Sequence, residues 1–247
     1  MKATQFEFRI RLIIIVLLYA LGFWAPWTWS AGHYSPPATT AWLALSTWLA
    51  RLDWLPLEQA TLLVTVLAIL FGLAGAALRV WGTAYLSAGV VHSAAMHGDQ
   101  MMAAGPYRYV RNPLYLGSVF LAVSIAILMP PSGAVVFLVA VGLFYFRLIL
   151  GEEAFLAGTI GEAYLDYKKR VPRLVPGLRA RTPPSPARPE WITSVVAETL
   201  PVGYSLCLAV LVWRYEPLLL IRCLLICFGL SLVTRAFLPK KKAAATA

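Results

Sequence analysis

The length of its apolar runs constrains this chain more than any other feature. A helix needs roughly 17 to 25 residues to cross a hydrocarbon core of about 30 Å, and the apolar runs of the 247-residue sequence come in blocks of about this length. With 60% hydrophobic and 13% charged residues, the composition also departs from that of soluble domains. We therefore predict an all-α polytopic membrane protein. Its expected spans, about six, are residues 10–29, 61–81, 114–129, 133–150, 195–213 and 218–237.

The distribution of cationic side chains predicts the orientation. Of the 21 Lys and Arg residues, all but Arg51, Arg214 and Arg222 lie at the two ends of the chain or in and beside the second-to-third and fourth-to-fifth connections. The positive-inside rule then places both termini and both polar connections in the cytoplasm, and an even number of spans agrees with this. We expect a bacterial inner-membrane protein whose active site faces the cytoplasm. The net charge of +10 suits anionic lipid headgroups, and we expect no nucleic-acid partner.

Proline-rich punctuation divides the chain. Pro130-Pro131-Ser132 predicts a tight helical hairpin between the third and fourth spans, and the stretch from Thr182 to Pro189 reads as a linker, because it cannot hold a helix. We expect an N-terminal span with an outer-face loop (1–60), a catalytic unit (61–181), the linker (182–190) and a C-terminal hairpin with a basic tail (191–247). The cysteines all fall in that hairpin as packing residues, and no metal site is expected.

The first of two polar segments precedes the third span. Residues 105–117 read Gly-Pro-Tyr-Arg-Tyr-Val-Arg-Asn-Pro-Leu-Tyr-Leu-Gly. Pro113 suits the first turn of a helix, and Asn112 is expected to cap that helix. A helix N-terminus beside Arg108 and Arg111 can hold an anion. The layout suits the carboxylate of a cofactor and a lipid phosphate about equally well.

The second polar segment follows the fourth span, over residues 151–176. It begins with Glu152 and Glu153, and carboxylates at the end of an apolar span ordinarily pair with cations or bind ligand. Arg147 is the expected structural partner of both. A simpler reading makes the rest of the segment an amphipathic surface helix whose Lys168, Lys169 and Arg170 meet anionic lipid. That reading leaves the glutamates and tyrosines of the segment unexplained.

Taken together and in order, these two segments resemble the isoprenylcysteine carboxyl methyltransferase and phospholipid methyltransferase superfamily, over roughly residues 68 to 177. The resemblance implies an integral membrane enzyme that uses S-adenosylmethionine. Carried over by motif, the implied cofactor-binding residues are Tyr107, Arg111, Asn112, Tyr115, Gly117, Glu152, Glu153 and Tyr167. The implied catalytic residues are Glu153, Tyr164, Arg170 and Arg173. The family usually has histidine where this chain has Asn112, so a role that needs an imidazole is in doubt.

The acceptor stays open at this stage. A prenylated cysteine carboxylate would be oriented by Arg170 or Arg173, whereas a phospholipid amine must lose a proton, with help from Glu152, Glu153 or Tyr164. The short chain slightly favours a small lipid over a lipidated protein. Two other functions compete. One is a sterol-type reductase using NADPH, although no Gly-x-Gly-x-x-Gly fingerprint is present. The other is a non-catalytic lipid-binding protein, for which Asn112 is the main motive.

Overall fold

The computed structural model describes residues 2–24, 40–86, 104–183, 187–214 and 217–237. Over these residues the chain is helical and contains no strand. The outer part of the first expected span (25–29), the middle of the linker (184–186) and the basic tail (238–247) lie outside them. In chain order the elements are α1 (Gln5–Arg9), α2 (Arg11–Trp24), α3 (Ala41–Arg51), α4 (Leu57–Leu86), η1 (Gly105–Arg108), α6 (Pro113–Ala126), α7 (Pro131–Ile160), α8 (Glu162–Arg170), α9 (Trp191–Ala197), α10 (Thr199–Arg214) and α11 (Pro217–Phe237).

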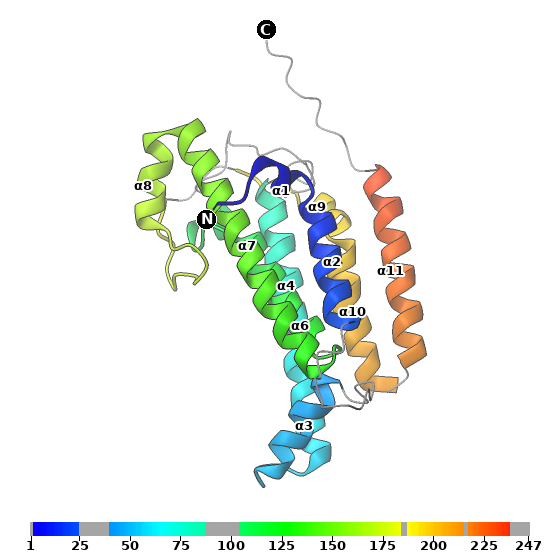
Figure 1. Cartoon of the computed structure of the whole chain (residues 1–247). Coiled ribbons are helices and arrows are strands. Elements are labelled where there is room, and N and C mark those ends of the chain that lie inside the picture. The colour runs from blue at the N-terminus through cyan, green and yellow to red at the C-terminus, as the bar shows by residue number, and fades with distance from the viewer. Residues whose placement is uncertain (1, 25–39, 87–103, 184–186, 215–216, 238–247) are drawn as a thin grey trace.

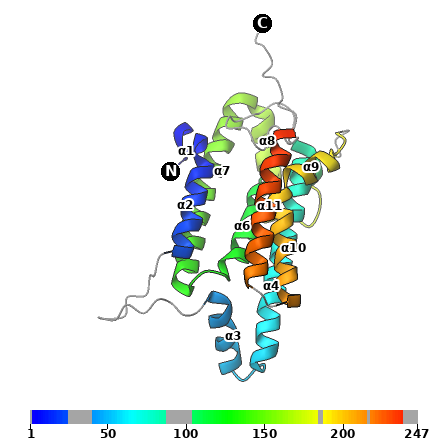
Figure 2. The same cartoon turned by 90° about the vertical axis from the view of Figure 1, so that its right-hand side faces the viewer.

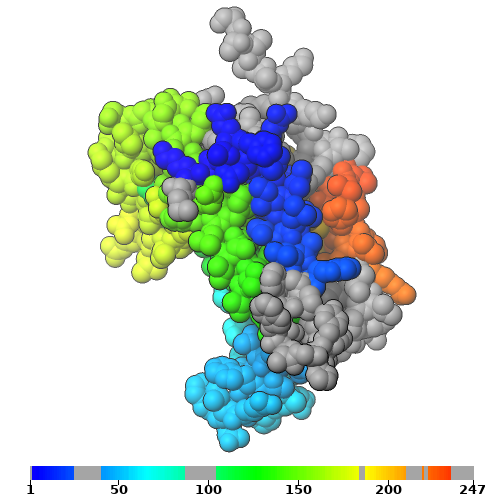
Figure 3. Space-filling view, in the orientation of Figure 1, coloured from blue at the N-terminus to red at the C-terminus, as the bar shows by residue number. Residues whose placement is uncertain are grey.

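The long helices run side by side and form a bundle (Figures 1 and 2). Its short elements α1, α8 and α9 lie at one end, which we call the polar end. Helix α3 packs against α4 at the opposite end, and the space-filling view shows it as a projection from the bundle (Figure 3). Helix α11 ends at the polar end, where α1 also lies (Figure 1).

Two helices are long and apolar enough to cross a membrane by themselves among the residues described. These are α4 and α7, with 30 residues each, or about 45 Å at 1.5 Å per residue. Helix α10 joins them if it is counted together with α9, and three shorter apolar helices, Arg11–Trp24, Pro113–Ala126 and Arg222–Thr234, accompany them. Such a set is consistent with a polytopic membrane protein.

Helix α7 extends past the end of the expected fourth span. It continues to Ile160 and stops at Gly161, whose φ of 69° favours glycine. Glu152 and Glu153 therefore lie inside a continuous helix, in its last three turns. A helix about 45 Å long exceeds a hydrocarbon core of about 30 Å, so one end of α7 can carry polar side chains beyond it.

The expected fifth span is broken near its start. Helices α9 and α10 meet at Glu198 with a bend of 71°. Pro201 supplies the physical cause, because its ring clashes with the carbonyl of the residue four positions earlier, Ala197, if the helix continues. Helix α9 ends at that alanine.

Glycines set the closest helix crossings. A Cβ atom added to Gly117 of α6 would lie 2.7 Å from the carbonyl oxygen of Gly75 in α4, and the reciprocal addition gives the same distance. The two backbones are thus in direct contact, as in other membrane helix pairs with small residues at the interface. On the other side of α6, buried side chains of α7 such as Phe137, Val141 and Leu148 form the main hydrophobic core.

Candidate functional site

The fold brings the two polar segments together at the polar end of the bundle. The backbone N–H of Arg111 donates to the carbonyl of Pro172 at 2.8 Å, and that of Gly177 donates to the carbonyl of Tyr109 at 2.9 Å. The loop after α8 is therefore tied along the segment that leads into α6. Residues some 60 positions apart in the chain become neighbours in this way.

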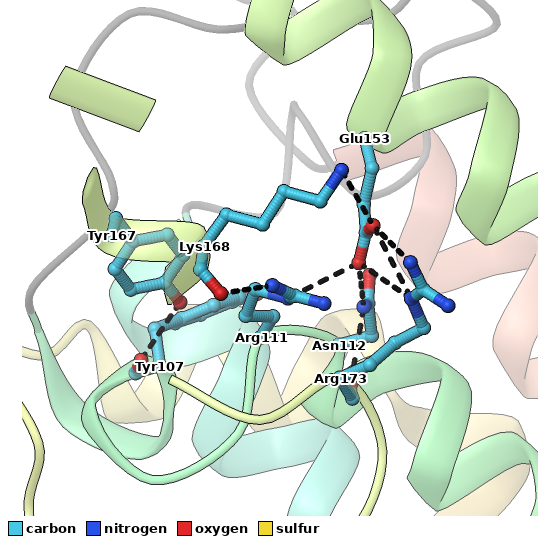
Figure 4. A network of polar contacts seen from close by, with 7 residues as sticks. All are labelled: Tyr107, Arg111, Asn112, Glu153, Tyr167, Lys168 and Arg173. Carbon is cyan, nitrogen blue, oxygen red and sulfur yellow. Dashed lines mark hydrogen bonds and ion pairs between the residues drawn. The ribbon is translucent and has the colours of Figure 1, made fainter. Parts of the chain in front are cut away.

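Glu153 is the centre of this junction (Figure 4). Its side chain projects from α7 and is only 2% exposed. Arg173 donates from Nη2 to Oε2 at 3.0 Å and from Nε to Oε1 at 3.1 Å. The Nε atom of Arg111 lies 3.2 Å from Oε1, and Nζ of Lys168 lies 3.9 Å from Oε2. Three cationic side chains thus surround one carboxylate, so positive charge is in excess.

Asn112 contacts the same carboxylate and does not cap α6, which corrects the expectation from sequence. Its Nδ2 atom donates to Oε1 of Glu153 and to the carbonyl of Arg173, both at 3.2 Å. No side-chain hydrogen bond caps the start of α6. The reason is chemical: the amide N–H group is drawn to an anion, and the helix begins with Pro113, which has no N–H to satisfy. Asn112 joins the start of α6 to α7 and to the loop after α8.

Two buried polar atoms in this site have no hydrogen-bond partner among the residues described. They are the hydroxyl oxygen of Tyr107 and the Nε atom of Arg111, whose approach to Glu153 lacks hydrogen-bond geometry. The Nη1 atom of Arg111 is occupied, since it donates to the carbonyl of Lys168 at 2.6 Å. Buried polar groups are almost always paired in proteins, so unpaired ones mark a place where a ligand completes the hydrogen bonds.

Glu152 lies beside Glu153 but faces different partners. It is half-buried and interacts with the hydroxyl of Tyr115 from α6. Arg11 at the start of α2 is also close enough to act on its charge. The adjacent glutamates of α7 therefore make separate contacts, one with a cationic cluster and one with a tyrosine.

The tyrosines of α8 support the site from one side. Tyr164 and Tyr167 are buried against each other, with ring centroids 5.9 Å apart, and pack with Val171. The hydroxyl of Tyr167 donates to the carbonyl of Tyr107 at 2.8 Å. Burial, and then the neighbouring Tyr164, raise the pKa of the Tyr167 phenol above its ordinary value. The phenol therefore stays protonated at physiological pH and remains a donor.

Two predicted site residues lie away from the Glu153 cluster. Gly117 is at the α4–α6 crossing, where its lack of a side chain allows backbone contact. Arg170 is exposed on α8, and its Nε atom donates to the carbonyl of Asp166 in the same helix. The other predicted residues lie in the Glu153 cluster, in the Glu152–Tyr115 pair or in the aromatic support from α8.

The expected pairing of Arg147 with Glu152 and Glu153 is wrong. Arg147 donates from Nη2 to both carboxylate oxygens of Glu7, at 2.7 and 2.9 Å. Residues share a helix face when they are three or four positions apart, whereas the glutamates are five and six positions away. The partner comes instead from α1, whose first turn is fixed by a capping box between Thr4 and Glu7.

Lys168 is a residue of the Glu153 cluster that sequence reasoning missed. It was grouped with Lys169 as a lipid-facing lysine, yet its ammonium points toward Glu153, while Lys169 pairs with Asp166 at 3.0 Å. A signal was present in the spacing. Lys168 follows Tyr164 by four positions and precedes Val171 by three, which places it on the buried face of α8.

Part of the chain is similar to known proteins. Residues 60–163 match the family model described as phospholipid methyltransferase. The chain is 30% identical over 152 residues to the protein-S-isoprenylcysteine O-methyltransferase of Mus musculus, covering 60% of this chain and 52% of that protein. The Homo sapiens protein of the same name is 29% identical over 153 residues, with the same coverage. The chain thus spans about half the length of the curated relatives it matches. No solved structure matches it significantly.

Proposed function

We propose that the chain, whose residues 60–163 match the phospholipid methyltransferase family model, is an integral membrane methyltransferase of that family. Its donor is S-adenosylmethionine, and its acceptor is a lipid or lipid-like molecule. When bound, the donor supplies an electrophilic methyl group on a sulfonium. The protein's own residues supply binding, orientation and exclusion of water, which together account for much of the catalysis of such a displacement.

Two buried donors that make no hydrogen bond among the residues described carry this proposal. The Arg111 Nε–H lies in a cluster with an excess of positive charge, and the Tyr107 hydroxyl is close enough to Glu152 for the glutamate's charge to act on it. A donor carboxylate offers both negative charge and hydrogen-bond acceptors. The carboxylate of Glu152 is available on the adjacent face for the ammonium of the same amino-acid group. We assign Arg111, Tyr107 and Glu152 to direct contact with the donor, and Glu153 to holding the cations in place.

Asn112 is compatible with this role. The family usually has histidine at its position, and a neutral imidazole can donate one N–H bond. The amide of Asn112 also donates, to Glu153 and to the Arg173 carbonyl. We assign it to fixing the start of α6 against α7, a task that does not need a titrating group.

The acceptor is assigned by chemistry. Arg173 is the more exposed of the two arginines in the cluster, with its side chain 32% exposed against 8% for Arg111, and would orient an anionic headgroup or an isoprenylcysteine carboxylate. Tyr164 and Glu153, the other predicted catalytic residues, assist from behind it. A phospholipid amine is the preferred acceptor. Arg170 is left as a surface residue that contacts lipid headgroups.

The membrane topology belongs to the same proposal. We propose six spans with both termini and the polar end in the cytoplasm of a bacterial cell, and residues 61–181 as the catalytic unit. The shorter apolar helices α2 and α6 then belong to the first and the third of these spans. The exposed cations of α8 and its loop lie at the cytoplasmic headgroups, as the positive-inside rule requires.

Ligand titration tests the proposal. Purified protein in lipid nanodiscs is titrated with S-adenosylmethionine, S-adenosylhomocysteine and NADPH, and heat of binding is measured. We expect binding of the first two only. Binding of NADPH alone would instead support a reductase, and binding of none would support a lipid-binding protein. Membranes incubated with methyl-labelled S-adenosylmethionine then show whether label enters the lipid or the protein fraction.

A further inference from the structure

A second buried ionic cluster lies at the break between α9 and α10, in the C-terminal hairpin. Glu198 is 1% exposed. Arg79 of α4 donates to its two carboxylate oxygens from Nε at 2.7 Å and from Nη2 at 3.0 Å. The hydroxyl of Thr83, also on α4, donates to Oε1 at 2.8 Å. Ionisable groups inside a membrane bundle are costly and usually have a function.

The remaining branch of Arg79 reaches the helix that begins at the candidate site. Its Nη1 atom donates to the hydroxyl of Ser118 at 2.7 Å. That hydroxyl donates in turn to the carbonyl of Leu114 at 3.0 Å, in the first turn of α6. A continuous chain of charge-assisted and neutral hydrogen bonds thus runs from Glu198 to the start of α6. Only the planar fork of arginine can make these contacts together.

The helices around Arg79 are packed so tightly that a shift of its side chain also shifts α6. Gly75 and Gly82 flank it on the face of α4 that meets α6. A Cβ atom on Gly75 would lie 2.7 Å from the Gly117 carbonyl oxygen, and one on Gly82 would lie 2.8 Å from Cδ2 of Leu114. Packed interfaces of this kind do not deform smoothly. A change in the Arg79 side chain must therefore be felt in the first turns of α6.

The start of α6 carries two residues of the candidate donor site. Asn112 immediately precedes this helix and contacts Glu153. Tyr115 lies in its first turn and interacts with Glu152. The helix start that Ser118 stabilises is therefore the part of α6 that faces both glutamates of α7.

We propose that Glu198 is a positioning residue for methyl-donor binding, which holds Arg79 and, through Ser118, the first turn of α6. The C-terminal hairpin then contributes to donor binding, although it lies outside residues 60–163, which match the family model. Glu198 and Arg79 do not contact the donor. The Nε, Nη1 and Nη2 atoms of Arg79 are all engaged within the protein.

This inference rests on the proposed function, and the test separates the two. The affinity for S-adenosylhomocysteine and the unfolding temperature are measured in nanodiscs for the wild type and for three variants. Failure of the wild type to bind overturns the proposed function itself, and this inference with it. With a binding wild type, the variants decide the inference alone.

The variants separate position from stability. Glu198→Gln and Arg79→Lys keep the side-chain length but remove the paired hydrogen bonds between the guanidinium and the carboxylate. We expect the dissociation constant for S-adenosylhomocysteine to rise about tenfold. The double variant Arg79→Met/Glu198→Leu removes both charges of this buried pair, so its unfolding temperature should return close to the wild-type value. Its affinity should stay low, because the link to Ser118 is lost. If a single variant does not fold, the double variant carries the test.

The control and the kinetic readout complete the test. Glu190→Gln makes the same charge change eight positions away on an exposed residue, and should leave affinity unchanged. In the lipid-methylation assay, loss of position raises the KM for the donor, whereas partial unfolding lowers kcat alone. Wild-type affinity and KM in the double variant would overturn the inference and leave Glu198 with a stabilising role only.

Discussion

At the scale of single residues, Glu153 determines how the cations of the candidate site are arranged. Glu153 is only 2% exposed. Its carboxylate pairs with Arg111, Arg173 and Lys168 and accepts a hydrogen bond from Asn112. Burying a charge is favourable only when it is paired and hydrogen-bonded. The same pairing that stabilises the fold therefore also fixes Arg111, which we assign to the donor.

The substitution Glu153→Gln tests this double role. It leaves Arg111 buried without a counter-ion, so we expect the free energy of unfolding to fall by about 3–5 kcal/mol. Affinity for S-adenosylhomocysteine should fall as well, because the cations no longer hold their positions. Thermal unfolding and calorimetric titration measure the two effects. Glu162→Gln, on an exposed residue at the start of α8, is the control, and equal behaviour of the two variants would refute the assignment.

Lys168 and Lys169 form a natural pair for a second prediction. Lys168 lies 3.9 Å from Glu153 with its side chain 39% exposed, whereas Lys169 pairs with exposed Asp166. Partly exposed ion pairs contribute about 0–1 kcal/mol, so Lys168→Met should weaken donor binding by at most about fivefold. Lys169→Met should have no effect. Titrations at low and high salt check this, since the Lys168 contribution should shrink with screening.

At the scale of elements, the crossing of α4 and α6 depends on two glycines. A Cβ atom on Gly117 would meet the Gly75 carbonyl oxygen at 2.7 Å and Cγ of Arg79 at 2.8 Å. The site residues at the start of α6 depend on this contact, because the same helix pair carries the Arg79 network. Gly117 is thus important for the site without lying beside Glu153.

Gly117→Ala should therefore destabilise the protein by about 1–3 kcal/mol, the usual cost of overpacking. The matched control is Gly142→Ala on α7, where an added Cβ atom meets nothing within 4 Å. Alanine is the better helix former there, so the control should be neutral or stabilising by up to about 1 kcal/mol. Unfolding temperatures of the two variants in detergent measure the difference. A stable Gly117→Ala variant would show that the helices have room to separate.

At the scale of the whole molecule, the polar end and the α3 projection should lie on opposite sides of the membrane. Lys169 and Trp54 mark these ends, and both side chains are exposed. In a background without native cysteines, Trp54→Cys should react with a membrane-impermeant maleimide on intact cells. Lys169→Cys should react only after the cells are opened. The reverse pattern would invert the proposed topology, and labelling of both in intact cells would exclude it.

Much of the fold class followed from sequence because it depends on local chemistry. Apolar runs and Pro130-Pro131 predict helices and the hairpin between two of them without knowledge of partners. The break at Glu198 was missed although Pro201 was visible, because a proline in the first turn of a helix is also well tolerated. The full length of α7 was missed because the end of an apolar run marks only the edge of the hydrocarbon core. A helix can continue beyond that edge, as α7 does to Ile160.

The candidate site shows where sequence stops being sufficient. The resemblance carried by the two polar segments predicted that Arg111, Glu153 and Arg173 belong to one site, and the structure places both arginines beside the Glu153 carboxylate. The sequence did not predict the partners of individual side chains. Arg147 pairs with Glu7, Asn112 donates to Glu153, and Arg79 pairs with Glu198. The physical reason is that apolar periodicity and helix punctuation act over one to several turns. The ion pairs of Arg173 with Glu153 and of Arg147 with Glu7 join residues 20 and 140 positions apart, and only the packed helices decide which of these charges meet.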